Sequence, residues 1–228
     1  MNASSDELPQ KTLRRLMRAW FEFERRLAQV PILARLDDGT FTLEDYRRLL
    51  LNLRPQVVEG ARWISRAASS FDRDHADVRS IVIGHAQEEH RDYTVLERDY
   101  VAAGGAHDDI LAQPRNLGTE ALHAFMMHTA TQPNPVEMLG AMWIIEGLGS
   151  RMAEQWAGRI EELTGLDENA TRFLRYHGEN DDSHLEKLYE MIQRLCTTED
   201  RSDRVVHMAR VVGRLYALQL EEIEHVDA

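Results

Sequence analysis

The sequence contains little lysine and cysteine and no long hydrophobic run. Only two of its 27 basic residues are lysines, Lys11 and Lys187, so Schiff-base and lysine general-base chemistry is not expected. The single cysteine, Cys196, excludes an intrachain disulfide and a thiolate metal cluster, and no base lies beside it in the sequence to make it a nucleophile. The longest apolar stretch, residues 138–145, has eight residues, whereas a membrane span needs about 20. We therefore expect no membrane segment.

Positive charge is also scarce. The 228 residues include 27 Lys and Arg against 39 Asp and Glu, which gives a formal net charge of −12. Nucleic-acid binding needs a basic face that displaces counterions, and anionic membranes attract basic segments, so the sequence predicts neither partner. The N-terminal residues 1–7 lack the basic and apolar regions of a signal peptide, and we expect a cytoplasmic protein.

Long helical patterns, separated by glycine and proline, account for most of the chain. Alternating β-branched runs are lacking, and the hydrophobic fraction of 43% is ordinary for a globular protein. The sequence therefore predicts an all-α bundle in a single domain over residues 1–228. Thr42 and Asp45 form a capping-box pattern, and Pro55 is expected to kink the helix that follows. Seven helices are expected, at about residues 8–30, 43–70, 76–103, 119–130, 136–163, 168–196 and 201–224.

The clearest chemical pattern lies in the sixth expected helix. His177, Asp181 and His184 have offsets 0, 4 and 7, so they project from one stripe about 60° wide. Imidazole and carboxylate ligands together suit iron, manganese or zinc. The two histidines are about 10 Å apart along the axis, which is long for one ion and reasonable for two ions with Asp181 between them. The alternative is a polar, solvated helix face.

The third expected helix repeats this geometry. His85, Glu89 and Asp92 have the same offsets, and Glu88 lies close to the same face. A second helix with such a stripe is what a site between two helices requires. His90 points away from the stripe and is expected at the surface.

A carboxylate interrupts the most apolar helical segment. Glu146 directly follows residues 138–145, and burying it without a partner would be costly. Its partner should be a metal, an arginine or a shared proton. Gly147 and Gly149 come next and allow a ligand or a neighbouring backbone to approach closely.

Together these features resemble the heme-oxygenase-like superfamily, and within it the non-heme diiron oxidases and oxygenases called iron-containing redox enzymes. The resemblance rests on segment 31–46, on the spacing from His85 to Gly104, on Glu146-Gly147 and on the triplet in residues 177–184. In that family the third helix presents a glutamate and then a histidine, whereas here the order is exchanged. The resemblance implies a seven-helix heme-oxygenase-like bundle whose metal ligands are His85, Asp92, Glu146, His177, Asp181 and His184, with Glu89, and after it Glu88, as replacements for Asp92.

The resemblance also implies the activity. Two irons per chain would activate O2 to hydroxylate, N-oxygenate, desaturate or cleave a small organic substrate. Arg54 and Arg62 are candidates to bind a substrate carboxylate, because guanidinium groups suit it. Heme is not expected, since the first helix contains no histidine, and a homodimer is expected from the family. The alternatives are a metal-free oxidase of the same fold, similar to pyrroloquinoline-quinone synthase, and a non-catalytic metal-binding helical protein.

Overall fold

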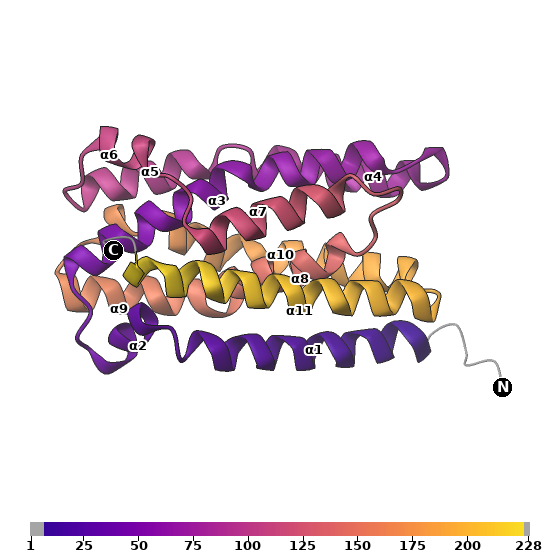
Figure 1. Cartoon of the computed structure of the whole chain (residues 1–228), viewed down its shortest axis with the longest axis horizontal. Helices are drawn as coiled ribbons and strands as arrows, with labels where there is room; N and C mark the ends of the chain where they lie inside the picture. The colour runs from indigo at the N-terminus through magenta and orange to yellow at the C-terminus, as the bar shows by residue number, and fades with distance from the viewer. Residues whose placement is uncertain (1–6, 226–228) are drawn as a thin grey trace.

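The computed structural model describes residues 7–225 of the chain, with the side chains at 180, 182, 183 and 225 excepted. This part of the chain contains α-helices and short 3-10 and π segments but no strand, so the all-α prediction is confirmed (Figure 1). The α-helices are α1 Glu7–Leu27, α2 Pro31–Asp38, α3 Leu43–Ser70, α4 Ala76–Glu89, α5 Asp92–Ala102, α6 His107–Ala112, α7 Leu117–Ala130, α8 Met138–Leu148, α9 Glu154–Thr164, α10 Arg172–Leu195 and α11 Glu199–Glu221.

The described residues therefore form more α-helices than the seven expected. Two expected helices are interrupted: one becomes α4 and α5, and the other becomes α8, a π-helical turn at Gly149–Ala153, and α9. Two short helices, α2 and α6, were not expected. The first helix ends at Leu27, before the expected stop at Pro31, and Pro31 instead begins α2. The first backbone nitrogen of a helix has no partner within the helix, so a proline, which lacks an N–H, is tolerated there. Gly39 then ends α2 with a φ of 77°, a left-handed conformation that suits glycine.

The capping signal of α3 was predicted correctly. The Thr42 side chain accepts a hydrogen bond from the backbone of Asp45, and the Asp45 carboxylate accepts one from the Thr42 backbone at 2.9 Å. Pro55 lies inside α3 without ending it. Because α3 continues past this proline, it runs along the whole bundle (Figure 1).

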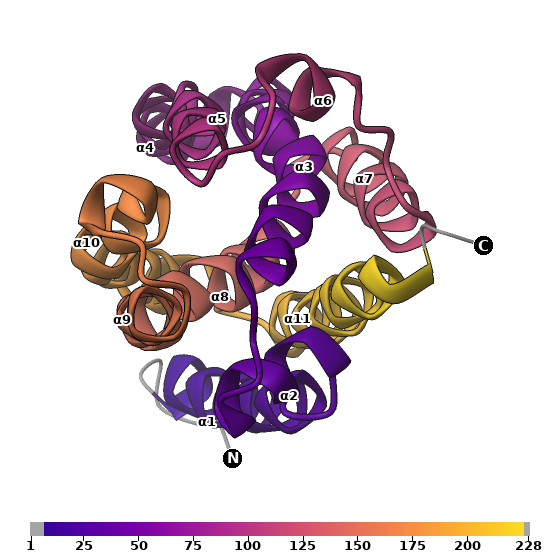
Figure 2. The same ribbon diagram turned by 90° about the vertical axis from the view of Figure 1, so that its left-hand side faces the viewer.

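The helices pack around α3 and α8. Seen along the bundle, these two helices pass through its middle and the others surround them (Figure 2). Helix α8 contacts α10 on one side and α11 on the other, and nine of its eleven residues are buried. Any polar side chain on α8 is therefore held at the centre of the fold. No helix within residues 7–225 is long and apolar enough to cross a membrane.

A buried carboxylate anchors the start of α10, the helix that carries the His177 triplet. Asp99 of α5 is 0% exposed and accepts a hydrogen bond from the Phe173 backbone at 2.7 Å. Burial raises the pKa of Asp99 to about 7, although the Phe173 hydrogen bond and the Arg172 charge oppose the rise. Asp99 thus holds the start of α10 in place. The burial that this position requires makes its carboxyl group harder to ionise.

Substitution of Asp99 by asparagine should change how stability depends on pH. Between about pH 4 and pH 7 the unfolded chain loses the Asp99 proton while the folded chain keeps it, so rising pH lowers the stability of the parent. The loss is as much as about 4 kcal/mol. Asp99→Asn keeps the acceptor for Phe173 but does not titrate, so relative to the parent it should gain stability between pH 5 and pH 8. Urea unfolding at both pH values measures the difference, and parallel behaviour of the two proteins would contradict it.

Candidate metal centre

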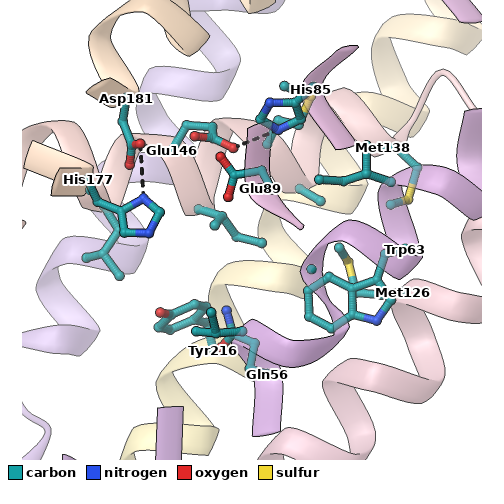
Figure 3. A pocket seen from close by; sticks show the side chains of 18 of the residues that line it. Gln56, Trp63, His85, Glu89, Met126, Met138, Glu146, His177, Asp181 and Tyr216 are labelled. Atoms are coloured by element: carbon teal, nitrogen blue, oxygen red, sulfur yellow. Dashed lines mark hydrogen bonds and ion pairs between the residues drawn. The ribbon is translucent and has the colours of Figure 1, made fainter. Parts of the chain in front are cut away.

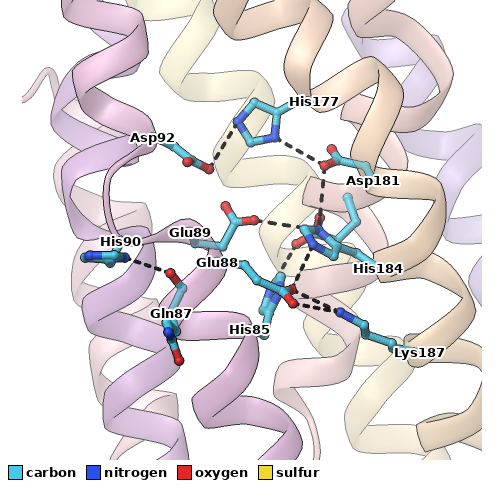
Figure 4. Close-up of polar contacts among 11 residues, drawn as sticks. His85, Gln87, Glu88, Glu89, His90, Asp92, His177, Asp181, His184 and Lys187 are labelled. Atoms are coloured by element: carbon cyan, nitrogen blue, oxygen red, sulfur yellow. Dashed lines mark hydrogen bonds and ion pairs between the residues drawn. The ribbon is translucent and has the colours of Figure 1, made fainter.

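Four helices bring the histidines and carboxylates identified in the sequence into one cluster. His85 and Glu89 come from α4, Asp92 from α5, Glu146 from α8, and the rest from α10 (Figure 4). The side chains form two groups of three, and within each group the potential ligand atoms lie within 4.8 Å of one another. The first group is His85, Glu146 and His184, and the second is Glu89, Asp92 and His177.

The first group is centred on Glu146. Its Oε1 lies 3.1 Å from His85 Nε2, and its Oε2 lies 3.0 Å from His184 Nδ1. The two imidazole rings meet edge to face, with centroids 4.7 Å apart. Within the described residues the partners of Glu146 are thus histidines, and the alternative of an arginine salt bridge finds no support. His85 Nε2 faces Glu146 Oε1, and His85 Nδ1 is buried with no hydrogen-bond partner among the described residues, an arrangement that suits a bound cation.

Asp181 connects the two groups. Its Oδ1 lies 3.2 Å from His177 Nδ1 and 3.7 Å from His184 Nδ1, so it stands between the histidines as the helical spacing predicted. In the second group His177 Nε2 is 3.6 Å from Asp92 Oδ2, and that oxygen is buried with no hydrogen-bond partner in the described part of the chain. Asp181 and His184 are 2% and 5% exposed. The alternative of a solvated helix face is therefore wrong.

Crowding of the carboxylates perturbs their ionisation. Burial, together with the charges of Glu146 and Asp92, raises the pKa of Glu89 to about 10. Burial also raises the pKa of Asp92, and that of Asp181 to about 6. Burial opposes ionisation of Glu146 as well, but its two histidine neighbours hold its pKa below the usual range. So many acidic groups in one buried place favour a cation among them.

The interruption between α4 and α5 separates Glu89 from Asp92. His90 is exposed and its Nδ1 donates a hydrogen bond to the Gln87 carbonyl at 2.7 Å, so it lies off the cluster as predicted (Figure 4). Asp92 starts a new helix, where it lies beside His177, while Glu89 Oε1 lies 3.6 Å from His184 Nδ1. Glu89 and Asp92 therefore both lie in the cluster, next to different histidines.

The π-helical turn after α8 makes room for Asp181. A Cβ atom at Gly149 would overlap Asp181 Oδ2 and lie 2.7 Å from Asp181 Cγ. The sequence indicated a close approach at this glycine, and the neighbour is the carboxylate side chain of α10. π-helical turns occur frequently at functional sites.

Glu88 lies on the outer side of the cluster. Its Oε2 is 3.2 Å from His184 Nε2, and both of its carboxylate oxygens accept hydrogen bonds from Lys187 at 3.0–3.1 Å. The Glu88 side chain is 44% exposed, in contrast to the buried carboxylates. Its position fits a group that orients His184 from outside better than one inside the cluster.

A cavity of about 150 Å³ adjoins the cluster. Its polar wall includes Glu89, Glu146, His177 and Asp181, and most of the remaining wall is apolar (Figure 3).

Cys196 is buried, and burial raises its pKa to about 11, in agreement with the expected absence of nucleophilic character.

Neither arginine suggested for substrate binding reaches this cavity. Arg54 pairs with Glu97 at 2.8 Å, and Arg62 pairs with Glu59 at 2.8 Å with its own side chain 67% exposed. Neither belongs to the cavity wall. The spacing along the expected helix could not tell a guanidinium directed into the bundle from one directed outward.

Two polar residues of the cavity wall were missed in the sequence. Gln56 of α3 and Tyr216 of α11 lie across the cavity from the cluster (Figure 3). Gln56 interrupts a helical stripe with Leu49, Leu53 and Trp63, which also line the cavity. A polar residue within an apolar stripe was the sequence signal that could have indicated Gln56. No such signal marked Tyr216, because the apolar pattern of its helix is typical of a core helix.

Solved structures with the same fold are known. A domain of unknown function with a heme oxygenase-like fold from Shewanella denitrificans OS217 superposes with a TM-score of 0.86 at 20% identity, over 92% of this chain and 90% of that one. A TenA homologue from Pseudomonas syringae pv. tomato DC3000 gives 0.75 at 14% identity, over 94% and 93%. A TenA homologue from P. horikoshii OT3 gives 0.74 at 15% identity, over 94% and 98%. The chain thus has the heme oxygenase-like fold that its sequence suggested.

Sequence similarity identifies the family. No curated protein matches the chain significantly. The family model described as iron-containing redox enzyme matches residues 59–217, a range that contains all seven candidate ligands and most of the chain. The chain therefore belongs to the family of iron-containing redox enzymes.

Proposed function

We propose that the chain is a non-heme diiron oxidase or oxygenase that uses O2 to oxidise a small organic molecule. The observation that carries this proposal is the pair of histidine–carboxylate groups beside one apolar cavity. Family membership supports iron as the metal. Imidazole and carboxylate donors suit that ion, and His85 Nδ1 and Asp92 Oδ2, which have no hydrogen-bond partner among the described residues, fit a bound cation.

The position of each side chain indicates which of the two ions it would bind. His85, Glu146 and His184 would hold one iron, and Glu89, Asp92 and His177 the other, with Asp181 between them. Bound iron would supply the redox chemistry that the side chains themselves lack. The carboxylates balance positive charge, and the apolar cavity wall excludes water from a substrate placed against the cluster.

Anaerobic iron titration tests the proposal. We expect about two ferrous ions to remain with each chain after desalting, and admission of O2 should consume oxygen in proportion to the bound iron. A chain that binds no iron would favour the metal-free oxidase. Bound iron that leaves O2 unconsumed would favour the non-catalytic metal-binding protein.

Single substitutions in the second group should remove one ion and leave the other. Glu89→Gln and Asp92→Asn each exchange a carboxylate for an uncharged isostere, and both should lower retained iron from about two to about one per chain. The loss of affinity should exceed the ~10–100-fold that changes around a ligand typically cause. Glu190→Gln, at an exposed position of α10, is the matched control and should retain both ions. Full retention in Asp92→Asn would remove Asp92 from the ligand set.

A further inference from the structure

The cavity beside the cluster is selective in charge. Among its described wall residues none is lysine or arginine, and the charged members all belong to the cluster. A carboxylate or phosphate placed at the end of the cavity opposite the cluster would be buried without a cation, which is costly. The cavity therefore accepts an uncharged body at that end.

The opposite end nevertheless carries two polar groups. Gln56 and Tyr216 are 5% and 7% exposed. Gln56 Oε1 is buried and has no hydrogen-bond partner among the described residues. Burial raises the pKa of the Tyr216 phenol to about 12, and a hydrogen bond with Gln56 opposes that rise. Tyr216 thus keeps its proton at neutral pH, and the pair offers an acceptor oxygen beside a hydroxyl that can donate.

Size limits the occupant further. A cavity of about 150 Å³ compares with the engineered apolar cavity of similar volume that stays dry and binds benzene. A buried water normally makes about three hydrogen bonds, and this end of the cavity supplies only the two groups. A ligand that fills the apolar part and brings one polar group would satisfy both.

We propose that the cavity binds an uncharged molecule about as large as one aromatic ring, whose hydroxyl group lies between Gln56 and Tyr216. The hydroxyl donates to Gln56 Oε1 and accepts from the Tyr216 hydroxyl. The apolar body then extends across Trp63 and Met126 toward the cluster (Figure 3). The ligand class is a phenol or a small alcohol. The inference rests on the proposed function only for the view that this ligand is the molecule oxidised.

Binding of four small ring compounds tests the proposal without any oxidation step. Phenol, toluene, benzaldehyde and benzoate are titrated by calorimetry into the parent protein, as purified and after iron loading. Phenol should bind, and benzoate should bind at least roughly tenfold more weakly. Benzaldehyde, which only accepts hydrogen bonds, should also bind less tightly than phenol. Equal affinity for phenol and benzoate, or no binding of any ring compound, would overturn the proposal.

Two variants assign the hydroxyl contact. Gln56→Leu and Tyr216→Phe should each lower the affinity for phenol relative to toluene by roughly three- to tenfold, the effect of one neutral hydrogen bond. Unchanged toluene binding shows that the cavity of the variant is intact. Gln10→Leu, the same change at an exposed position of α1, should leave both affinities as they are. An unchanged ratio of phenol to toluene affinity in both cavity variants would refute the assignment.

The outcome is independent of the iron titration. A protein that binds phenol through Gln56 but retains no iron keeps this inference and loses the diiron proposal. A protein that retains two irons but binds no phenol keeps the diiron proposal and loses this inference.

Discussion

Ferrous iron at a hundred times its dissociation constant should stabilise the folded chain by about 2.7 kcal/mol for each site that it fills. For a domain of this size that free energy corresponds to a rise in Tm of roughly 5–11 °C. The physical reason is mass action, since the donors of α4, α5, α8 and α10 come together only in the folded chain. Thermal unfolding under nitrogen, with and without ferrous iron, measures the gain.

Glu146→Gln should remove most of this stabilisation. Glu146 lies within about 3 Å of His85 and His184 at the centre of the fold, so its charge acts on both imidazoles of the first group. The amide has nearly the same shape but no negative charge with which to hold a cation. Glu190→Gln, at an exposed position of α10, is the matched control and should keep the full gain.

The histidine partner should behave in the same way. His184→Ala removes an imidazole that faces Glu146 and Asp181, while His107→Ala removes an exposed one from α6. Only the first should lose the iron-dependent rise in Tm. If both Glu146→Gln and His184→Ala retain the parental rise, the cluster is a network of buried ion pairs and the diiron proposal fails.

Gly149→Ala is the second change with a large expected effect. The new methyl group would overlap the Asp181 carboxylate and lie 3.3 Å from His177 Cβ, so the carboxylate must leave its place between the two histidines. Overpacking of this kind typically destabilises a protein by about 1–3 kcal/mol. The variant should also lose retained iron, because Asp181 no longer joins the two groups. Urea unfolding and iron analysis measure the two effects separately.

A second glycine supplies the control. Gly158 lies in α9, close in sequence, and a Cβ atom there would meet no other atom within 4 Å. Gly158→Ala should therefore stabilise the chain, by about 0.5–1 kcal/mol, since alanine favours a helix interior. Combining Gly149→Ala with Asp181→Ala should relieve the overlap and recover stability without recovering iron. Loss of stability in Gly149→Ala that persists in this double variant would show that the overlap is not its cause.

The candidate ligands were predictable because helical periodicity acts over short distances. Offsets of 0, 4 and 7 place His177, Asp181 and His184 on one face of any regular helix, and the structure keeps that helix intact. Glu146 was predictable for another reason, since a carboxylate in so apolar a segment needs a partner. The sequence left open which partner that is, and it did not indicate that two histidines from different helices lie beside the carboxylate.

The interruptions of helices were not predictable from periodicity. The chain breaks after Glu89 where the exposed His90 bonds to the Gln87 carbonyl, and the spacing of apolar residues does not mark that place. The π-helical turn at Gly149–Ala153 has the Asp181 carboxylate of another helix directly beside Gly149. Helix propensity contains neither feature.

The sequence alone determined the all-α class, the helix faces that carry imidazole and carboxylate groups, and the resemblance that pointed to the family. These are properties of one segment at a time, set by side-chain spacing and composition. Only the tertiary structure decided that Glu89 and Asp92 both join the cluster, that Arg54 and Arg62 point elsewhere, and that Gln56 and Tyr216 face the same cavity. These facts depend on how helices distant in sequence rotate against one another, and that rotation is set by the packing of the whole core.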